Sequence, residues 1–312
     1  MVPTGVSGGG GGRHRRDRLG AETFAEHLAA ASRRLGVTSF ALALLLAGAE
    51  PEELATVVTA SARDVDGVAF GDVIGANAAI LTVALGVGAL VTTIPFGRRV
   101  RRYALGGLAA GLLAAALMWN GTVGRGEGAL LVFGYLLFVG VIWRLERRPP
   151  ALGETAQLLD GNGPGETGRD AVMVLVGLVF LSGGSVVIVE AVRRITDVEA
   201  EQTRLGLTVV GFATAFELVV LAWSAARHGV TDAVVAGVVG SYAYNMTVSL
   251  GAGALVAPIA VDNATLVRAP LVAMLALMAL VLAITARTGH LDRRHAIALL
   301  ASYAAFVIVA TR

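Results

Sequence analysis

The sequence contains no cysteine and no lysine, and only 15% of its 312 residues are charged. Without cysteine, the chain has no disulfide framework, no thiolate nucleophile and no cysteine-based zinc or iron–sulfur site. It also has no Walker segment, which argues against a nucleotide site and an ATP-driven pump. The five histidines show none of the spacings of metal-binding motifs, which argues against a histidine metal site (His14, His27, His228, His290 and His295).

The chain is instead strongly apolar, with 55% hydrophobic residues and a mean hydropathy of +0.72. This leaves too little polar surface for a soluble domain, and the 40 glycines and eight prolines are better tolerated in membrane helices. The net charge of +2 is too spread out to indicate a nucleic-acid partner. We therefore expect an all-α polytopic membrane protein whose partner is the lipid bilayer. The apolar runs of the chain are each near the ~20 residues that cross a bilayer, so they predict about nine transmembrane helices. The predicted helices are 37–61, 67–93, 103–121, 128–144, 170–191, 205–226, 232–257, 267–286 and 294–311.

Two polar segments divide the chain. Residues 1–36 combine a glycine run, a basic cluster and an amphipathic stretch, which predicts a disordered to amphipathic N-terminal segment. Residues 145–169 form the longest polar connection and are the expected linker between two halves, 37–144 and 170–312. All 25 basic residues are arginines, and grouping them by the predicted loops puts 18 on one side and seven on the other. The positive-inside rule then predicts a multi-pass protein of the plasma (inner) membrane, with its N-terminus and linker in the cytoplasm.

The two halves contain similar sequences. VIGANAAILTVALGVGALV (73–91) aligns without a gap with VVGSYAYNMTVSLGAGALV (238–256), at a spacing of 165 residues. Upstream, EELATVVTASA (52–62) pairs with FELVVLAWSAA (216–226) at a spacing of 164, which superposes Glu53 on Glu217. An odd number of spans lies between the copies, so they enter the membrane in opposite directions. This pattern predicts an inverted-topology repeat.

Each copy also carries acidic residues within an apolar helix, where a charge costs at least about 2.5 to 3.5 kcal/mol. The glycine and proline of GAEPEEL (48–54) predict a helix break beside three acids, and GFATAFEL (211–218) places Gly211 and Thr214 before Glu217. Two broken helices related by a pseudo-two-fold axis would bring these acids together near the membrane midplane, among oxygen ligands that suit hard cations such as calcium. The alternative interpretation is that GAEPEE caps a helix in a solvated loop.

These segments resemble the paired alpha-repeats of the sodium/calcium exchanger family, in the cation/calcium antiporter superfamily. The family pattern is GTSxPEL followed, about two dozen residues later, by GSNxxN, once per half. Here the first half reads GAEPEEL and GDVIGANAAI, and the second reads FATAFEL and GVVGSYAYN. The resemblance covers roughly residues 37–311 and implies ten helices, five per half, of which the first is truncated in this chain. A misassigned start and a genuine nine-helix protein both remain open.

The resemblance also implies a set of ion ligands, in which Glu53 and Glu217 are shared by the competing ions. Neutral oxygens would come from Asn77, Thr214, Ser241 and Asn245, and two acids outside the family pattern, Glu50 and Asp72, would add to the metal site. The chain departs from the pattern at Ala49, Ala76 and Ile80, where the family has oxygen-bearing side chains. These losses remove several sodium-coordinating oxygens and shift the expectation slightly from sodium toward proton coupling.

The expected function is a secondary-active antiporter that exchanges Ca²⁺, or a similar divalent cation, for Na⁺ or H⁺ by alternating access. Two facing carboxylates neutralise one divalent ion, two monovalent ions or two protons, so these cations compete for one site. No resident cofactor is implied, and a homodimer stays open. The alternatives are a non-transporting ion-sensing or structural member of the family and a membrane-embedded enzyme. We expect no enzyme, because GxSxG, HExxH and similar catalytic motifs are absent.

Overall fold

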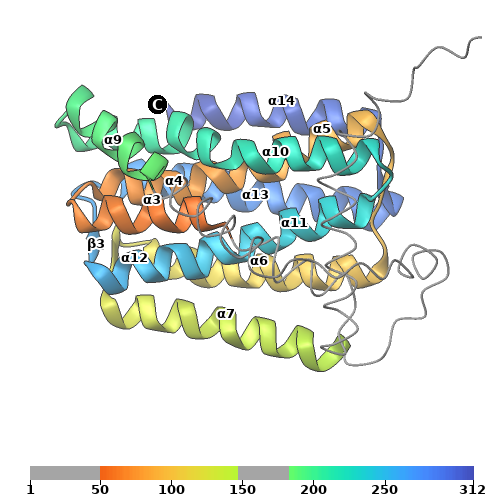
Figure 1. Ribbon diagram of the computed structural model, residues 1–312, viewed down its shortest axis with the longest axis horizontal. Coiled ribbons are helices and arrows are strands. Elements are labelled where there is room, and N and C mark those ends of the chain that lie inside the picture. Colours follow the sequence, from red (N-terminus) through yellow and green to blue (C-terminus); the bar gives the residue numbers. More distant parts are fainter. Residues whose placement is uncertain (1–49, 147–182) are drawn as a thin grey trace, which may run out of the picture.

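The computed structural model describes residues 50–146 and 183–312, which form a bundle of long helices (Figure 1). The first repeat contains α3 (Pro51–Ala62), α4 (Asp66–Ala79), the π-helical turn η1 (Ile80–Ala84), α5 (Leu85–Val91), β1 (Ile94–Pro95), α6 (Arg98–Met118), β2 (Thr122–Val123) and α7 (Arg125–Glu146). After a helix at residues 183–195, the second repeat contains α9 (Glu199–Leu205), η3 (Gly206–Val210), α10 (Gly211–Arg227), α11 (Thr231–Tyr244), η4 (Asn245–Ser249), α12 (Leu250–Val256), β3 (Ile259–Ala260), α13 (Thr265–Thr288), β4 (His290–Leu291) and α14 (Arg293–Ala310).

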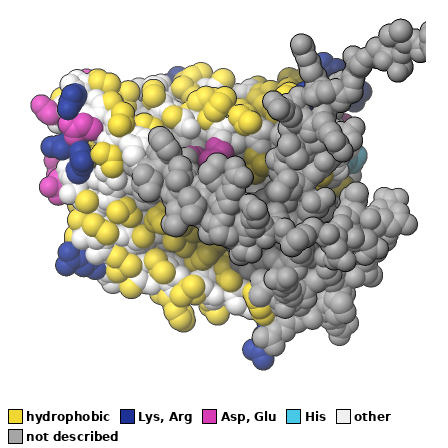
Figure 2. All heavy atoms as spheres, viewed as in Figure 1, with side chains coloured by type: hydrophobic (Ala, Val, Ile, Leu, Met, Phe, Trp, Pro, Cys, Tyr) yellow, Lys and Arg dark blue, Asp and Glu magenta, His cyan; other side chains and the backbone are white. Residues whose placement is uncertain are grey.

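Six helices in the described part of the chain are long and apolar enough to cross a membrane: Asp66–Val91, Arg98–Met118, Arg125–Leu145, Glu199–Arg227, Thr265–Thr288 and Arg293–Ala310. Figure 2 shows a broad hydrophobic surface along the bundle, with charged side chains gathered toward its ends. The all-α membrane architecture is therefore confirmed. The expected truncation of the first helix, the N-terminal segment predicted at 1–36 and the predicted linker from residue 147 onward lie outside the described residues, so the total of nine spans stays a prediction.

The predicted internal repeat is present in the structure. Four consecutive elements of the first repeat, α4, η1, α5 and β1, recur as α11, η4, α12 and β3, each beginning 165 residues later. Figure 1 shows the two long helices built from these elements passing through the bundle. The hydrogen bond from Phe96 N–H to Gly289 C=O (2.7 Å) has a counterpart from Val261 N–H to Gly121 C=O (2.9 Å).

The directions of the helices show that the repeat is inverted. Along α4, Gly67 lies beside Thr203, and Gly71 lies beside Gly206. Because both residue numbers rise together, α4 runs parallel to the helix formed by α9, η3 and α10. A three-residue turn then reverses the chain between α10 and α11. It follows that α11 runs opposite to its counterpart α4.

Two short antiparallel ladders connect the repeats. β1 pairs with β4, and β3 pairs with β2, so each repeat supplies one strand to each ladder. Gly121 and Gly289, whose carbonyls accept the bonds described above, have φ values of 85° and 73°, a left-handed conformation that glycine adopts without a steric penalty. The β1–β4 ladder brings together the arginine-rich segments at 98–102 and 287–294, as the charge grouping predicts.

The three π-helical turns share a local sequence that we did not predict. They read ILTVA, GLTVV and NMTVS, with threonine at the third position of each. Each threonine hydroxyl donates to the carbonyl four residues earlier: Thr82 to Ala78, Thr208 to Arg204 and Thr247 to Ala243. Such a bond satisfies a carbonyl where the regular hydrogen-bond ladder is disturbed. In the second repeat, the predicted helix break before Glu217 therefore takes the form of a π-helical turn rather than a complete interruption.

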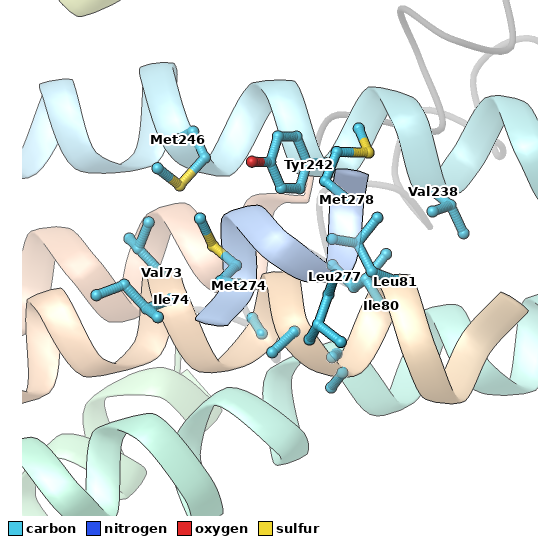
Figure 3. Packing of buried hydrophobic residues seen from close by; sticks show 14 of the residues in the cluster. Val73, Ile74, Ile80, Leu81, Val238, Tyr242, Met246, Met274, Leu277 and Met278 are labelled. Atoms are coloured by element: carbon cyan, nitrogen blue, oxygen red, sulfur yellow. The ribbon is translucent and has the colours of Figure 1, made fainter. Parts of the chain in front are cut away.

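Tyr242 is fully buried in α11, beside the methionines of α13 in Figure 3, and its hydroxyl has no hydrogen-bond partner. It packs on α6, where a Cβ at Gly111 would lie only 2.2 Å from the Tyr242 hydroxyl oxygen. Gly111 is therefore the residue that makes room for the ring.

We expect Gly111→Ala to lower the free energy of unfolding by about 1 to 3 kcal/mol through overpacking. Tyr242→Phe should leave stability unchanged or raise it by about 1 kcal/mol, because it removes an unsatisfied buried hydroxyl. Thermal unfolding in detergent measures both. In the Tyr242→Phe variant, Gly111→Ala should lower the free energy of unfolding by less than it does in the wild type. The reason is that, without the hydroxyl, the atom nearest to the new Cβ is the ring carbon at 2.9 Å. Additive effects of the two substitutions would contradict this packing account.

Candidate functional site

Acidic side chains gather where the start of α3 meets α4, α10 and α11. Pro51 occupies the first helical position of α3, and Glu50 before it has an extended backbone (φ −104°, ψ 95°). This helix start agrees with the predicted effect of proline. It places Glu52 and Glu53 in the first turn, where exposed N–H groups favour negative charge.

Three of these acids are removed from solvent. The exposed fractions are 9% for Glu50, 1% for Glu53 and 0% for Asp72. Glu53 interacts electrostatically with the carboxyl groups of Glu50 and Asp72. In the described part of the chain, the ion pairs involve Glu190 and Asp292 rather than these site acids. The site acids therefore have no ion-pair partner among the described residues.

Two hydroxyls of the second repeat bond to acids of the first. Thr214 Oγ1, on α10, donates to Asp72 Oδ1 at 2.9 Å. Ser241 Oγ, on α11, donates to Glu50 Oε1. The sequence predicts all four residues as ligands but not these contacts. The two hydrogen bonds join the repeats at the site itself.

Each buried acid keeps unpartnered oxygens. Glu50 Oε2, Asp72 Oδ2 and both carboxylate oxygens of Glu53 are buried without a hydrogen-bond partner. A buried carboxylate oxygen without a partner is costly, and buried carboxylates commonly coordinate metal ions or pair with cations. Among residues 50–146 and 183–312, however, no three acidic or histidine side chains converge in a metal-holding group. The described acids thus lie near one another but do not form a ready-made metal-binding group in this conformation.

Glu217 lies at a more open position than the other ligands. It is exposed, whereas the sequence favours an enclosed side chain, and Glu52 beside it is half-buried. The carboxyl groups of these two residues interact directly, and Glu217 also interacts with Glu50. Figure 2 shows acidic side chains next to hydrophobic ones on this face, away from the charged end of the bundle. Glu52 and Glu217 therefore form an outer pair next to the buried acids.

The two predicted amide ligands are buried but have other partners in this structure. Asn77 donates from Nδ2 to the Val73 carbonyl at 2.9 Å, which leaves its Oδ1 unpartnered. Asn245 accepts at Oδ1 from Ser249 Oγ at 3.4 Å, and its Nδ2 is unpartnered. The structure thus brings together the six predicted acid and hydroxyl residues, while the two amides have no hydrogen bond to the described acids.

Two further residues reach the site without a sequence signal. Ser185, in the helix at 183–195, donates to the backbone carbonyl of Glu52 at 2.9 Å. Tyr244, on α11, lies within electrostatic reach of Glu53 and Glu50. Both contacts join segments that are far apart in the chain. Ser185 lies outside the motif and Tyr244 occupies a variable position within GVVGSYAYN, so the family pattern identifies neither of them.

Comparisons with known proteins identify the family and the fold of the chain. The family described as sodium/calcium exchanger protein matches residues 19–144 and 170–312. "Putative antiporter CaxA" of Alkalimonas amylolytica is 27% identical over 281 residues, which cover 88% of this chain and 85% of that protein. "Inner membrane protein YrbG" of Escherichia coli is 24% identical over 224 residues, covering 69% and 68% of the two chains.

The fold is also that of a solved transporter. A structure of the sodium-calcium exchanger NCX_Mj, soaked with 100 mM Na⁺ and 10 mM Sr²⁺, superposes with a TM-score of 0.70. The match covers 94% of both chains at 18% sequence identity. A second structure of that exchanger, soaked without Na⁺ and Ca²⁺, gives a TM-score of 0.68 with the same coverage.

Proposed function

The chain belongs to the sodium/calcium exchanger family, and from this premise we propose that it is a secondary-active antiporter for Ca²⁺ or a similar divalent cation. The counter-ion is Na⁺ or H⁺, and transport proceeds by alternating access between the inverted repeats. The observation that carries the proposal is the set of buried carboxylate oxygens without partners on Glu50, Glu53 and Asp72, where the two repeats meet. Oxygen-only ligands of this kind suit hard cations.

In this proposal, Glu53 and Glu217 are the shared ligands, because they occupy equivalent positions in the two repeats. Neutral oxygens come from Asn77, Thr214, Ser241 and Asn245, and Glu50 and Asp72 contribute further carboxylates. Asn77 keeps an unpartnered Oδ1 for the ion, whereas Asn245 Oδ1 binds the ion if it exchanges its present hydrogen bond from Ser249. Such an exchange is consistent with a transporter that has more than one conformation.

The departures from the family pattern favour protons as the counter-ion. Ala49, Ala76 and Ile80 stand where the family has oxygen-bearing side chains, so several oxygens that would coordinate sodium are missing. Sodium keeps support from the relatives, since NCX_Mj is a sodium-calcium exchanger whose crystals were soaked with Na⁺ and Sr²⁺. CaxA carries only the name of a putative antiporter. The family and fold are those of a transporter, which disfavours the membrane-embedded enzyme.

We further propose that the protein lies in the plasma (inner) membrane, with its N-terminus and central linker in the cytoplasm. The observed ladder between β1 and β4 supports this orientation, because it places the two arginine-rich segments at one end of the bundle. The division into an N-terminal segment, two repeats and a linker is likewise retained as a proposal.

The test is radioactive calcium uptake into proteoliposomes under an imposed sodium gradient and, separately, an imposed proton gradient. We expect uptake with one of them, which names the counter-ion, and its loss when an ionophore collapses that gradient. Absence of uptake with both gradients, also in a chain extended by an upstream helix, would contradict the calcium antiporter. Calcium binding without flux would instead support the non-transporting alternative.

A further inference from the structure

Arginines from both repeats gather at the end of the bundle that carries the β1–β4 ladder. The ladder pairs Pro95 with His290, and α6 and α14 both begin at this end, where α13 ends (Figure 1). A further bond runs from Arg101 Nη1, on α6, to the Ala286 carbonyl near the end of α13, at 3.3 Å. The cluster, which we call the arginine end, consists of Arg98, Arg99, Arg101, Arg102, Arg287, Arg293 and Arg294.

The positive charge of this cluster is not neutralised within the described part of the chain. Asp292 is the only acid in the segments 98–102 and 287–294. Its Oδ1 already accepts the backbone N–H groups of Arg294 and His295, and it lies 3.0 Å from His295 Nδ1. Among residues 50–146 and 183–312, six of the seven arginines have no ion pair with an acid: Arg98, Arg101, Arg102, Arg287, Arg293 and Arg294.

The starts of two helices make this charge more costly. The N-terminus of a helix has exposed N–H groups and a partial positive charge, which favour anions and disfavour cations. α6 nevertheless begins at Arg98, with no acid in its first turn and no side-chain cap from Gly97. α14 begins with Arg293 and Arg294 behind the cap residue Asp292. The positive-inside rule requires basic residues on one side of the membrane, but it does not require them at helix starts.

Exposed aliphatic side chains lie next to these arginines on the same helices. Residues three or four positions apart share a helix face. Leu105, exposed at 55%, follows Arg102 at this spacing, and Ile297, exposed at 59%, follows Arg294. On both helices, a cation therefore lies where the apolar segment begins, and an aliphatic side chain lies one turn further in. A phospholipid has the same order, with a phosphate at the membrane interface and acyl chains below it.

We propose that the arginine end binds the headgroup of an anionic phospholipid of the phosphatidylglycerol type. The lipid connects α6 of the first repeat with α14 of the second, and its phosphate supplies the negative charge that the described residues lack. A zwitterionic lipid fits less well, because its ammonium group cancels the charge of the phosphate. Free phosphate would leave Leu105 and Ile297 without an acyl chain to contact. The inference does not depend on which ions the protein transports.

Titration of the purified protein with phosphatidylglycerol in a non-ionic detergent tests the proposal, with the midpoint of thermal unfolding as the readout. We expect the midpoint to rise with phosphatidylglycerol and to stay unchanged with phosphatidylcholine or inorganic phosphate. The variant that combines Arg102→Gln and Arg294→Gln should need about 10- to 30-fold more phosphatidylglycerol for half of this rise. The matched control combines Arg193→Gln and Arg194→Gln, which removes two exposed charges outside the arginine end, and should respond like the wild type.

The midpoints without lipid provide a second comparison. The Arg102→Gln, Arg294→Gln variant should then be at least as stable as the wild type, because it loses like charges near two helix starts. A lower midpoint without lipid, with an unchanged response to phosphatidylglycerol, would show that acids of this chain neutralise the arginines, and would overturn the proposal. Equal responses to phosphatidylglycerol and phosphatidylcholine or inorganic phosphate, or equal losses in the variant and its control, would also overturn it.

Discussion

Glu53→Gln and Glu217→Gln should each lower the rate of gradient-driven calcium uptake by at least about 100-fold. The substitutions remove a negative charge from the cation while keeping the size of the side chain. Even the outer partners of metal ligands typically cost about 10- to 100-fold in affinity when they are mutated, so a direct ligand should cost more. Glu53 is buried and Glu217 is exposed, so the two variants test a buried and an exposed ligand of the same shared site.

The control for these variants is Asp197→Asn, an exposed acid in the segment between the helix at 183–195 and α9. Its uptake rate should remain at the wild-type level. Thermal unfolding of all three variants in detergent separates a lost ligand from a lost fold. If a folded Glu53→Gln or Glu217→Gln variant takes up calcium at the wild-type rate, that residue is not an ion ligand.

Gly75→Ala should produce the largest loss of stability among single-methyl additions in the bundle core. A Cβ at Gly75 would lie 2.3 Å from the Leu207 carbonyl oxygen and 2.7 Å from the carbonyl carbon. These are backbone atoms, so no side-chain rotation relieves the clash, and α4 must move away from η3. We expect a loss at or above about 3 kcal/mol, the upper end of typical overpacking costs.

The matched control is Gly140→Ala in α7, where a Cβ would meet no atom within 4 Å. That variant should be neutral or gain about 0.5 to 1 kcal/mol, because alanine costs less conformational entropy in a helix. The midpoint of thermal unfolding in detergent compares the two. Equal midpoints for both variants would show that the close approach of α4 and η3 does not determine stability. Such small-residue contacts are expected to hold helices together in lipid, where apolar burial alone provides little association energy.

Much of the fold could be predicted because the chain repeats itself. The gapless alignment of 73–91 with 238–256 predicts equal helices, and the structure confirms them at the same spacing. Pro51 predicts the start of α3, since proline lacks the N–H needed inside a helix. The pairing of Glu53 with Glu217 follows from the upstream alignment of 52–62 with 216–226, at a spacing of 164 residues. These features depend on local residues or on internal symmetry, both of which are present in the sequence.

The remaining features arise from contacts between segments that no pattern connects. The bonds from Thr214 to Asp72 and from Ser241 to Glu50 depend on how α10 and α11 approach α3 and α4. The exposure of Glu217 likewise depends on its neighbours rather than on its flanking residues. The π-helical turns were missed for another reason. Their threonine lies in an ordinary apolar run, and only the comparison of three such turns reveals the shared pattern.

The π-helical turns η1 and η4 also indicate how the two-repeat chain evolved. A π-helical turn corresponds to one extra residue within an α-helix, and it is rare enough that two independent insertions at one place are improbable. Here the turns lie at Ile80–Ala84 and Asn245–Ser249, at equivalent places in the two copies. We infer that the insertion occurred in a single ancestral half, before gene duplication produced the two-copy chain. Each half then diverged around an inherited irregularity.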